Sequence, residues 1–195
     1  MERSDRGLLE AHRGGDPQAF AELVRRHGPA VLGYLRKMTG NADTADDLFQ
    51  ETFRRVHEKA HTLKSDRFKP WLFTIATRLA LDGFRRSRRV TFLSLDRTEG
   101  PDGDGQTGAD CLADEAACEP VEVMAKDERR RQVRQAIGGL PPRQRVTLVL
   151  AYYQRLSYPE IAEVLGCSTG AVKTQMFRAL KTLAQRLPEG VGEMT

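Results

Sequence analysis

Residues 157–178 read SYPEIAEVLGCSTGAVKTQMFR, which is the strongest structural signal in the chain. Residues 157–160 have the Ser-x-x-Glu order of a capping box, with Pro inside it, and predict the start of a helix. Ala162 is small enough to let two helices approach closely. Gly166 permits the left-handed backbone of a turn, and Val172 is placed to pack the second helix against the first. The spacing predicts a helix-turn-helix.

The second helix of this motif carries polar and basic side chains on its outer side. Short polar groups at a helix start, with cations further along, suit the base edges and phosphates of a DNA major groove. An ordinary helical hairpin with a solvated polar face is the alternative. The candidate DNA-contacting residues are Ser168, Thr169, Lys173, Thr174, Phe177 and Arg178.

The rest of the chain also has helical periodicity. Asp16-Pro17 is a helix start with Asp as N-cap and Pro at the first helical position. Apolar residues then recur at three- and four-residue steps over 20–38, 45–60 and 71–80, with a possible break at Gly28-Pro29. No segment alternates as a half-buried strand does, so we predict an all-α fold.

Composition excludes several classes of protein. The chain has 195 residues, a net charge of +4 and a mean hydropathy of −0.51. No apolar run approaches the ~18 residues of a membrane span, and the N-terminus lacks the apolar core of a signal peptide. An odd count of 3 cysteines argues against a disulfide framework and favours the cytoplasm. Cys111 and Cys118 could form a reversible disulfide or a metal clip, although incidental thiols are the simpler interpretation, and Cys167 is expected as buried filler.

The charge is unevenly distributed along the chain. Residues 1–90 carry 18 basic and 12 acidic side chains, residues 91–126 carry 2 and 9, and residues 127–195 carry 11 and 6. The central segment also contains the run EGPDGDGQTG at residues 99–108, which has little to bury. We therefore predict two small helical domains, at 1–90 and 127–190, joined by a flexible acidic linker at 91–126.

The first domain has two candidate binding surfaces. One is an acidic helix face, whose members are Asp43, Asp46, Asp47, Gln50 and Glu51. It could be a solvated surface, a pair of catalytic carboxylates, a metal site or a docking site for a basic partner, and the absence of His and Cys among these residues argues against the metal. The other interleaves basic and aromatic side chains, as single-stranded nucleic acid requires. Trp71 there is equally compatible with the core. This second set includes Lys64, Arg67, Phe68, Lys69, Trp71, Phe73, Arg78 and the run Arg85–Arg89.

One motif points to a different class of function. Residues 57–61 read HEKAH, which matches the H-E-x-x-H pattern of zinc hydrolases. Such a site needs a third ligand, and Asp82 is the only acidic residue at about the usual distance downstream. A zinc hydrolase using His57, Glu58 and His61 is therefore a remote alternative, and we expect neither a metal nor a cofactor.

Together these motifs resemble the extracytoplasmic-function (ECF) sigma factors, the promoter-recognition subunits of bacterial RNA polymerase. The resemblance covers residues from about 15 to 187. It rests on Asp16–Val24, Ala45–Phe53, Phe68–Ala76, Asp82–Arg86, Leu140–Arg145 and the helix-turn-helix, in that order. Arg78 departs from the family, which commonly has Asn there.

The resemblance implies a role for each surface. A polymerase-binding face would comprise Asp46, Asp47, Leu48, Gln50, Glu51 and Arg54. Recognition and melting of the minus-ten promoter element would use Arg67, Phe68, Lys69, Trp71, Thr77, Arg78, Arg85 and Arg86. The helix-turn-helix residues named above would read the minus-thirty-five element.

The function expected from the resemblance is promoter-specific transcription initiation, without catalysis by the chain itself. The implied partners are core RNA polymerase, promoter DNA and an anti-sigma factor, with no membrane insertion. A stand-alone helix-turn-helix regulator, which would bind duplex DNA without polymerase, is the alternative.

Overall fold

The computed structural model describes residues 3–63, 65–94 and 120–187, with side chains described except at 87–94 and 120–127. These residues form helices and no strand, in agreement with the all-α prediction. The first half contains α1 (Asp5–Arg13), α2 (Pro17–Thr39), α3 (Ala42–Lys59), the 3-10 turn η1 (Ala60–Thr62) and α4 (Phe68–Ser94). The second half contains α5 (Pro120–Gly138), α6 (Pro142–Tyr152), α7 (Tyr158–Leu165) and α8 (Thr169–Arg186).

The helices start and stop where local chemistry requires. Asp16 caps α2 by accepting hydrogen bonds from the backbone N–H groups of Gln18 and Ala19, and Ser168 caps α8 in the same way through Ala171. Helix α7 begins at the predicted capping box and ends at Gly166, whose φ of 62° lies in the left-handed region that favours glycine. The helix-turn-helix is thus confirmed as α7 and α8.

Helix α2 is unbroken, although Gly28-Pro29 predicted a possible break. A proline inside a helix removes one backbone hydrogen bond and costs about 3 kcal/mol. The apolar face continues on both sides of it, with Leu23, Val31 and Leu35 fully buried. Each such side chain contributes roughly 1.5–3 kcal/mol, so packing outweighs the local preference.

The helices also extend beyond the segments assigned to them. Helix α4 runs to Ser94 and α5 begins at Pro120, so both enter the 91–126 segment interpreted as linker. The remainder of that segment, with Cys111 and Cys118, lies outside the described residues, as does Lys64.

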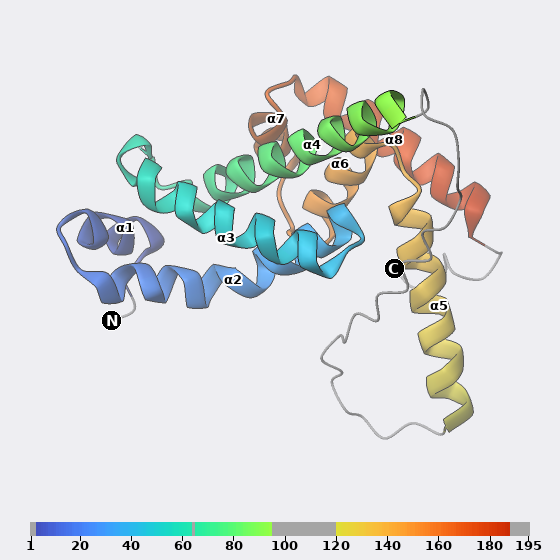
Figure 1. Ribbon diagram of the computed structural model, residues 1–195, viewed down its shortest axis with the longest axis horizontal. Coiled ribbons are helices and arrows are strands. Elements are labelled where there is room, and N and C mark those ends of the chain that lie inside the picture. Colours follow the sequence, from blue (N-terminus) through green and yellow to red (C-terminus); the bar gives the residue numbers. More distant parts are fainter. Residues whose placement is uncertain (1–2, 64, 95–119, 188–195) are drawn as a thin grey trace.

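Both halves contribute to one continuous core. Within the first half, Tyr34 and Thr77 have no exposed surface, and their hydroxyls are 2.7 Å apart in a buried hydrogen bond. Helix α7 packs against α4, and α6 packs against α2, so that the second half lies against the first (Figure 1). The core is therefore formed by elements on both sides of the predicted linker.

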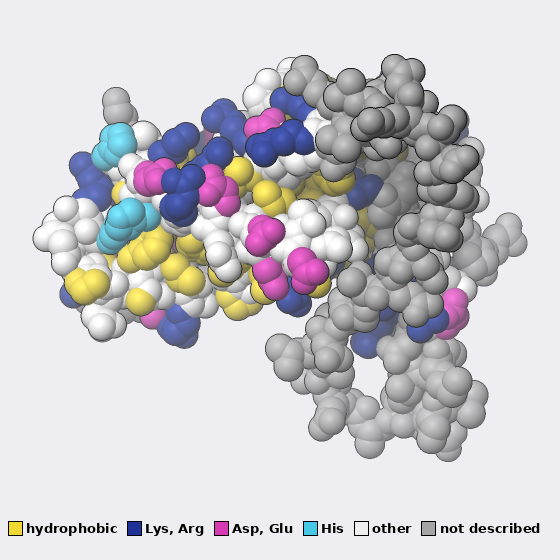
Figure 2. Space-filling view, viewed as in Figure 1, with side chains coloured by type: hydrophobic (Ala, Val, Ile, Leu, Met, Phe, Trp, Pro, Cys, Tyr) yellow, Lys and Arg dark blue, Asp and Glu magenta, His cyan; other side chains and the backbone are white. Residues whose placement is uncertain are grey.

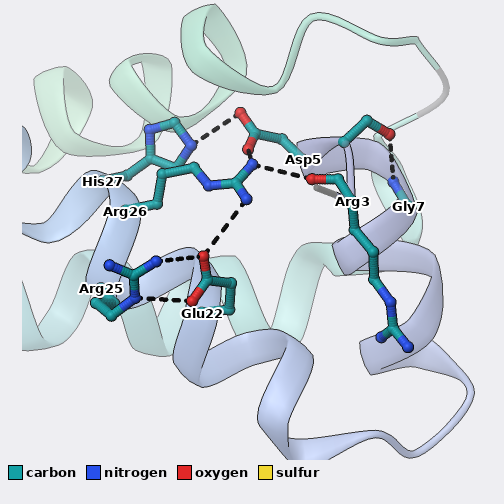
Figure 3. A network of polar contacts seen from close by, with 8 residues as sticks. Arg3, Asp5, Gly7, Glu22, Arg25, Arg26 and His27 are labelled. Atoms are coloured by element: carbon teal, nitrogen blue, oxygen red, sulfur yellow. Dashed lines mark hydrogen bonds and ion pairs between the residues drawn. The ribbon is translucent and has the colours of Figure 1, made fainter. Parts of the chain in front are cut away.

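Helix α1 was not anticipated from the sequence, and a polar network holds it against α2. The Asp5 carboxylate accepts from Arg26 Nη1 at 2.7 Å and pairs with His27 Nε2 at 2.8 Å (Figure 3). Leu8 and Leu9 are buried beside this network. Because a nine-residue helix is marginal on its own, these tertiary contacts are what make α1 stable.

The network predicts a pH dependence of stability. Burial lowers the pKa of His27 below its ordinary 6.5, although Asp5 opposes the shift. Folded His27 therefore binds its proton more weakly than the unfolded residue, and stability is lost as the pH falls from about 6.5 towards the lower pKa of the folded state. We expect a lower free energy of unfolding at about pH 5.5 than at about pH 7.5, and a smaller difference in His27→Gln. Urea denaturation at both pH values measures this, and an equal pH dependence in the two proteins would contradict it.

Candidate functional site

The acidic face lies on the N-terminal half of α3. Asp43, Asp46, Asp47 and Gln50 are exposed, and acidic side chains gather over this part of the molecule in Figure 2. Asp46 is 3.7 Å from Arg36, whereas Asp47 has no ion-pair partner among the described residues. Its carboxylate is thus available to a basic partner without breaking an internal contact.

Glu51 differs from these carboxylates because arginine side chains of the same helix, α3, already bind its carboxylate. Arg54 and Arg55 each donate to Glu51 at 2.7 Å. The hydrogen bond from Arg54, followed by that from Arg55, lowers the pKa of Glu51 to about 2. Arg54 also pairs with Glu58 one turn further along. Glu51 and Arg54 therefore form an internal ion-pair chain at the edge of the acidic face.

The loop before α4 and the start of that helix form a pocket with a volume of about 320 Å³. This lies at the lower end of the range of small-molecule sites, roughly 300–1,000 Å³. The side chains of Trp71 and Arg67 both line the wall, so an aromatic ring and a cation border the same pocket. The lining residues are Thr62, Leu63, Ser65, Arg67, Pro70, Trp71, Thr74 and Glu163.

The other residues assigned to the minus-ten element divide into buried and exposed sets. Phe68 is 1% exposed and Thr77 has no exposed surface, because Phe68 packs in the core and Thr77 bonds to Tyr34. Neither side chain is accessible to DNA in this arrangement. Arg78, Arg85 and Arg86 are exposed on α4, and Arg85 is 3.1 Å from Asp82.

Helix α8 presents its outer face to solvent. The exposed side chains are Lys173, Thr174, Phe177 and Arg178. Val172, on the inner side of the helix, is fully buried, as its spacing in the motif predicts. The Thr174 hydroxyl already donates to the Gly170 carbonyl at 3.0 Å. The exposed phenyl ring and the two cations are therefore the groups most available to a ligand.

Sequence reasoning missed several pocket-lining residues. Thr62, Leu63, Ser65 and Thr74 are ordinary loop and helix residues without a pattern of their own. Glu163 comes from α7, about a hundred positions away, so no local signal could have placed it here.

The H-E-x-x-H match lies at the C-terminal end of α3 and in η1. The His57 ring is 4.8 Å from the His12 ring and 5.5 Å from Phe20, which places it in an aromatic cluster. Within the described ranges, no three His, Cys, Asp or Glu side chains are placed to hold a metal ion. In those same ranges, no helix is both long and apolar enough to cross a bilayer.

Comparison with known families gives the class of the protein. Residues 23–90 match sigma-70 region 2, and residues 130–183 match sigma-70 region 4. The two matches fall on the two halves described above. The chain is therefore a sigma-70-type protein carrying regions 2 and 4.

Similarity to individual curated proteins identifies the group of sigma factors to which the chain belongs. SigW of Bacillus subtilis, an ECF RNA polymerase sigma factor, is 30% identical over 96% of this chain and 98% of its own length. RpoE of Cereibacter sphaeroides, another ECF sigma factor, is 31% identical over 92% and 91%. The chain spans 65% of the longer BldN of Streptomyces coelicolor, to which it is 32% identical. The protein belongs to the ECF sigma factors, which direct promoter-specific transcription initiation and are not an enzyme family.

Solved structures support the same fold. CnrH, solved in complex with the cytosolic domain of CnrY, is 28% identical with a TM-score of 0.64, over 94% of this chain and 96% of that one. RpoE of Bartonella quintana, solved with the anti-sigma factor NepR, has a TM-score of 0.68 at 22% identity, over 88% and 98%. The fold likeness therefore extends over both halves of the chain.

Proposed function

We propose that this protein binds core RNA polymerase through the acidic face of α3 and recruits it to promoters through two DNA contacts. The acidic face of α3, the pocket beside α4 and the outer face of α8 follow one another along the chain. That this order falls within matches to sigma-70 regions 2 and 4 supports the proposal most directly. The exposed carboxylates of Asp46 and Asp47, beside half-buried Leu48, suit a basic and partly apolar partner.

The minus-ten contact is proposed for the pocket beside α4. Arg67 and Lys69 would hold phosphates, and Trp71 would stack against a base taken out of the duplex, which helps to offset the few kcal/mol of unstacking. Arg78, Arg85 and Arg86 would follow the strand along α4. Phe68 and Thr77, which are buried, would act by holding α4 in place.

The minus-thirty-five contact is proposed for α8, with α7 supporting it. Residues 1–90 and 127–190 would act as separate DNA-binding units, and their connection by one chain would raise the effective concentration of the second contact after the first. We place the protein in the cytoplasm with polymerase and expect no catalysis by the chain itself. Because CnrH and the Bartonella RpoE were solved with CnrY and NepR, we also propose a protein inhibitor of the anti-sigma type.

Run-off transcription with purified core polymerase on a promoter library tests the function. We expect transcripts only when this chain is added, and the enriched promoters would supply the two recognised sequences. The Asp47→Lys variant provides the control for dependence on polymerase docking. Specific binding to duplex DNA without polymerase, and no transcripts with it, would favour a stand-alone regulator.

Removing Arg178 tests base recognition by α8. A bidentate contact of arginine to a base is worth about 1–3 kcal/mol of discrimination, so Arg178→Ala should lose about 5- to 150-fold of affinity on the selected promoter and much less on other sequences. Lys181→Ala, which removes an exposed cation one turn along the same helix, is the matched control. Fluorescence anisotropy of holoenzyme on both DNAs measures the difference. An equal loss on all sequences would make Arg178 a phosphate contact only.

A further inference from the structure

Helix α1 reaches the pocket beside α4 through the segment that precedes that helix. Asp66 lies at the centre of residues 65–67, outside any helix and between two side chains that line the pocket. Its carboxylate accepts a hydrogen bond from Arg6 Nη1 of α1 at 3.0 Å. The Nε of the same guanidinium donates to Glu10 at 2.8 Å, so two of the Arg6 nitrogens are engaged. One side of the pocket wall is therefore tied to α1.

A second connection joins α1 to the aromatic side of the pocket wall. Asp5 pairs with His27 Nε2 of α2 at 2.8 Å (Figure 3). The centre of the His27 ring lies 5.0 Å from that of Phe68, and the Phe68 ring lies 5.8 Å from that of Trp71. Phe68 is 1% exposed, so it has little room to move between its two neighbours. A change at Asp5 therefore reaches the indole through two packed rings.

The third connection is the packing of α1 against the 3-10 turn η1. That turn ends at Thr62, which lines the pocket. The lining residues named above include none from α1, so its three contacts act on the wall and not on a ligand. A wall that is already in place does not have to be ordered when its ligand binds, and preorganisation of this kind raises affinity.

We infer that α1 positions the wall of the minus-ten pocket, Arg6 through Asp66 and Asp5 through His27. Both are positioning residues, because neither lines the pocket. The positioning stands on the contacts above, whereas the identity of the ligand as an unstacked promoter base rests on the proposed function. The Arg6 and Asp66 side chains are 47% and 81% exposed, and an exposed ion pair contributes little to global stability. Loss of this pair should therefore act on the pocket and leave the fold intact.

The only tryptophan of the chain, Trp71, makes the positioning measurable without DNA or polymerase. We expect Arg6→Ala to increase the quenching of its fluorescence by acrylamide, because the wall beside the indole is no longer held. Combining Arg6→Asp with Asp66→Arg restores the ion pair with its charges exchanged and should return the quenching to its native value. Arg131→Ala, which removes an arginine from an exposed ion pair on α5, is the matched control. Circular dichroism checks that every variant is folded.

Two substitutions of Asp5 test the second connection. Asp5→Ala releases His27 and should also increase the quenching of Trp71 fluorescence. Asp5→Asn keeps an oxygen acceptor for Arg26 and His27, so its quenching should lie between those of the native protein and Asp5→Ala. A loss of helical signal in step with the quenching would assign Asp5 to the stability of the fold alone.

Affinity of the holoenzyme for DNA with a pre-melted minus-ten segment measures the consequence for the ligand. Arg6→Ala should lose about two- to five-fold of this affinity, which is the range of an exposed ion pair. The charge-exchanged pair should recover most of it, and Arg131→Ala should bind as the native protein does. A duplex carrying only the upstream element should be bound equally by Arg6→Ala and the native protein, because α8 lies in the other half.

Native quenching in Arg6→Ala would overturn the inference, whatever the DNA result. If Trp71→Ala weakens binding to the melted DNA but Arg6→Ala changes only the quenching, the positioning of a DNA pocket is overturned and the proposed function stands. If neither variant weakens that binding, the proposed role of the pocket fails, and a change in quenching would still show that α1 positions its wall.

Discussion

Replacing Asp47 by Lys is expected to weaken binding to core RNA polymerase strongly. Asp47 is exposed on α3 and has no ion-pair partner among the described residues, so its substitution leaves the fold intact. A lysine there would meet the basic partner proposed for this face, and like charges brought together at an interface cost several kcal/mol. We expect a loss of about 2–4 kcal/mol, which is roughly 30- to 1,000-fold in Kd.

Titration of labelled protein with core polymerase measures this loss at several salt concentrations. Glu128→Lys, with the same change of charge on exposed α5, is the control and should bind as the native protein does. Glu51→Gln should weaken binding less than Asp47→Lys, because Arg54 and Arg55 already engage that carboxylate. Native affinity in Asp47→Lys would exclude this face as the docking site.

The elements that could be predicted from sequence are those with strong local signals. The helix-turn-helix needs a capping box, a left-handed glycine and a buried Val172, and each of these acts within a few residues. The all-α class follows in the same way from a period of three to four in the apolar residues. These features can be predicted because they depend on residues close together in the sequence and need no knowledge of tertiary packing.

The features that were missed depend on contacts between distant parts of the chain. Helix α1 carries a short apolar pair, Leu8 and Leu9, and is stabilised by the Asp5 network with α2. The burial of Thr77 depends on Tyr34, which is 43 positions away. The sequence pattern grouped basic and aromatic residues as one surface, but it could not separate Trp71, which lines the pocket, from Phe68 and Phe73, which are buried in the core.

Replacing Trp71 by Ala is expected to impair promoter melting while leaving upstream binding intact. The indole is half-buried, lies 5.8 Å from the Phe68 ring and forms part of the pocket wall. Stacking of a base on an aromatic side chain is worth about 1–3 kcal/mol. Holoenzyme affinity for DNA with a pre-melted minus-ten segment should therefore fall by about 5- to 150-fold.

The comparison of two DNAs separates stacking from a general loss of structure. Trp71 also packs on the core, so its removal lowers stability, and unfolding would weaken binding to every DNA. A duplex carrying only the upstream element should be bound equally by Trp71→Ala and the native protein, because α8 lies in the other half. Trp71→Phe should recover most of the binding to melted DNA, since a smaller ring still offers a stacking face. Equal losses on both DNAs, or no recovery in Trp71→Phe, would assign Trp71 to the core alone. The pocket would then lack the aromatic ring that makes it a site for an unstacked base.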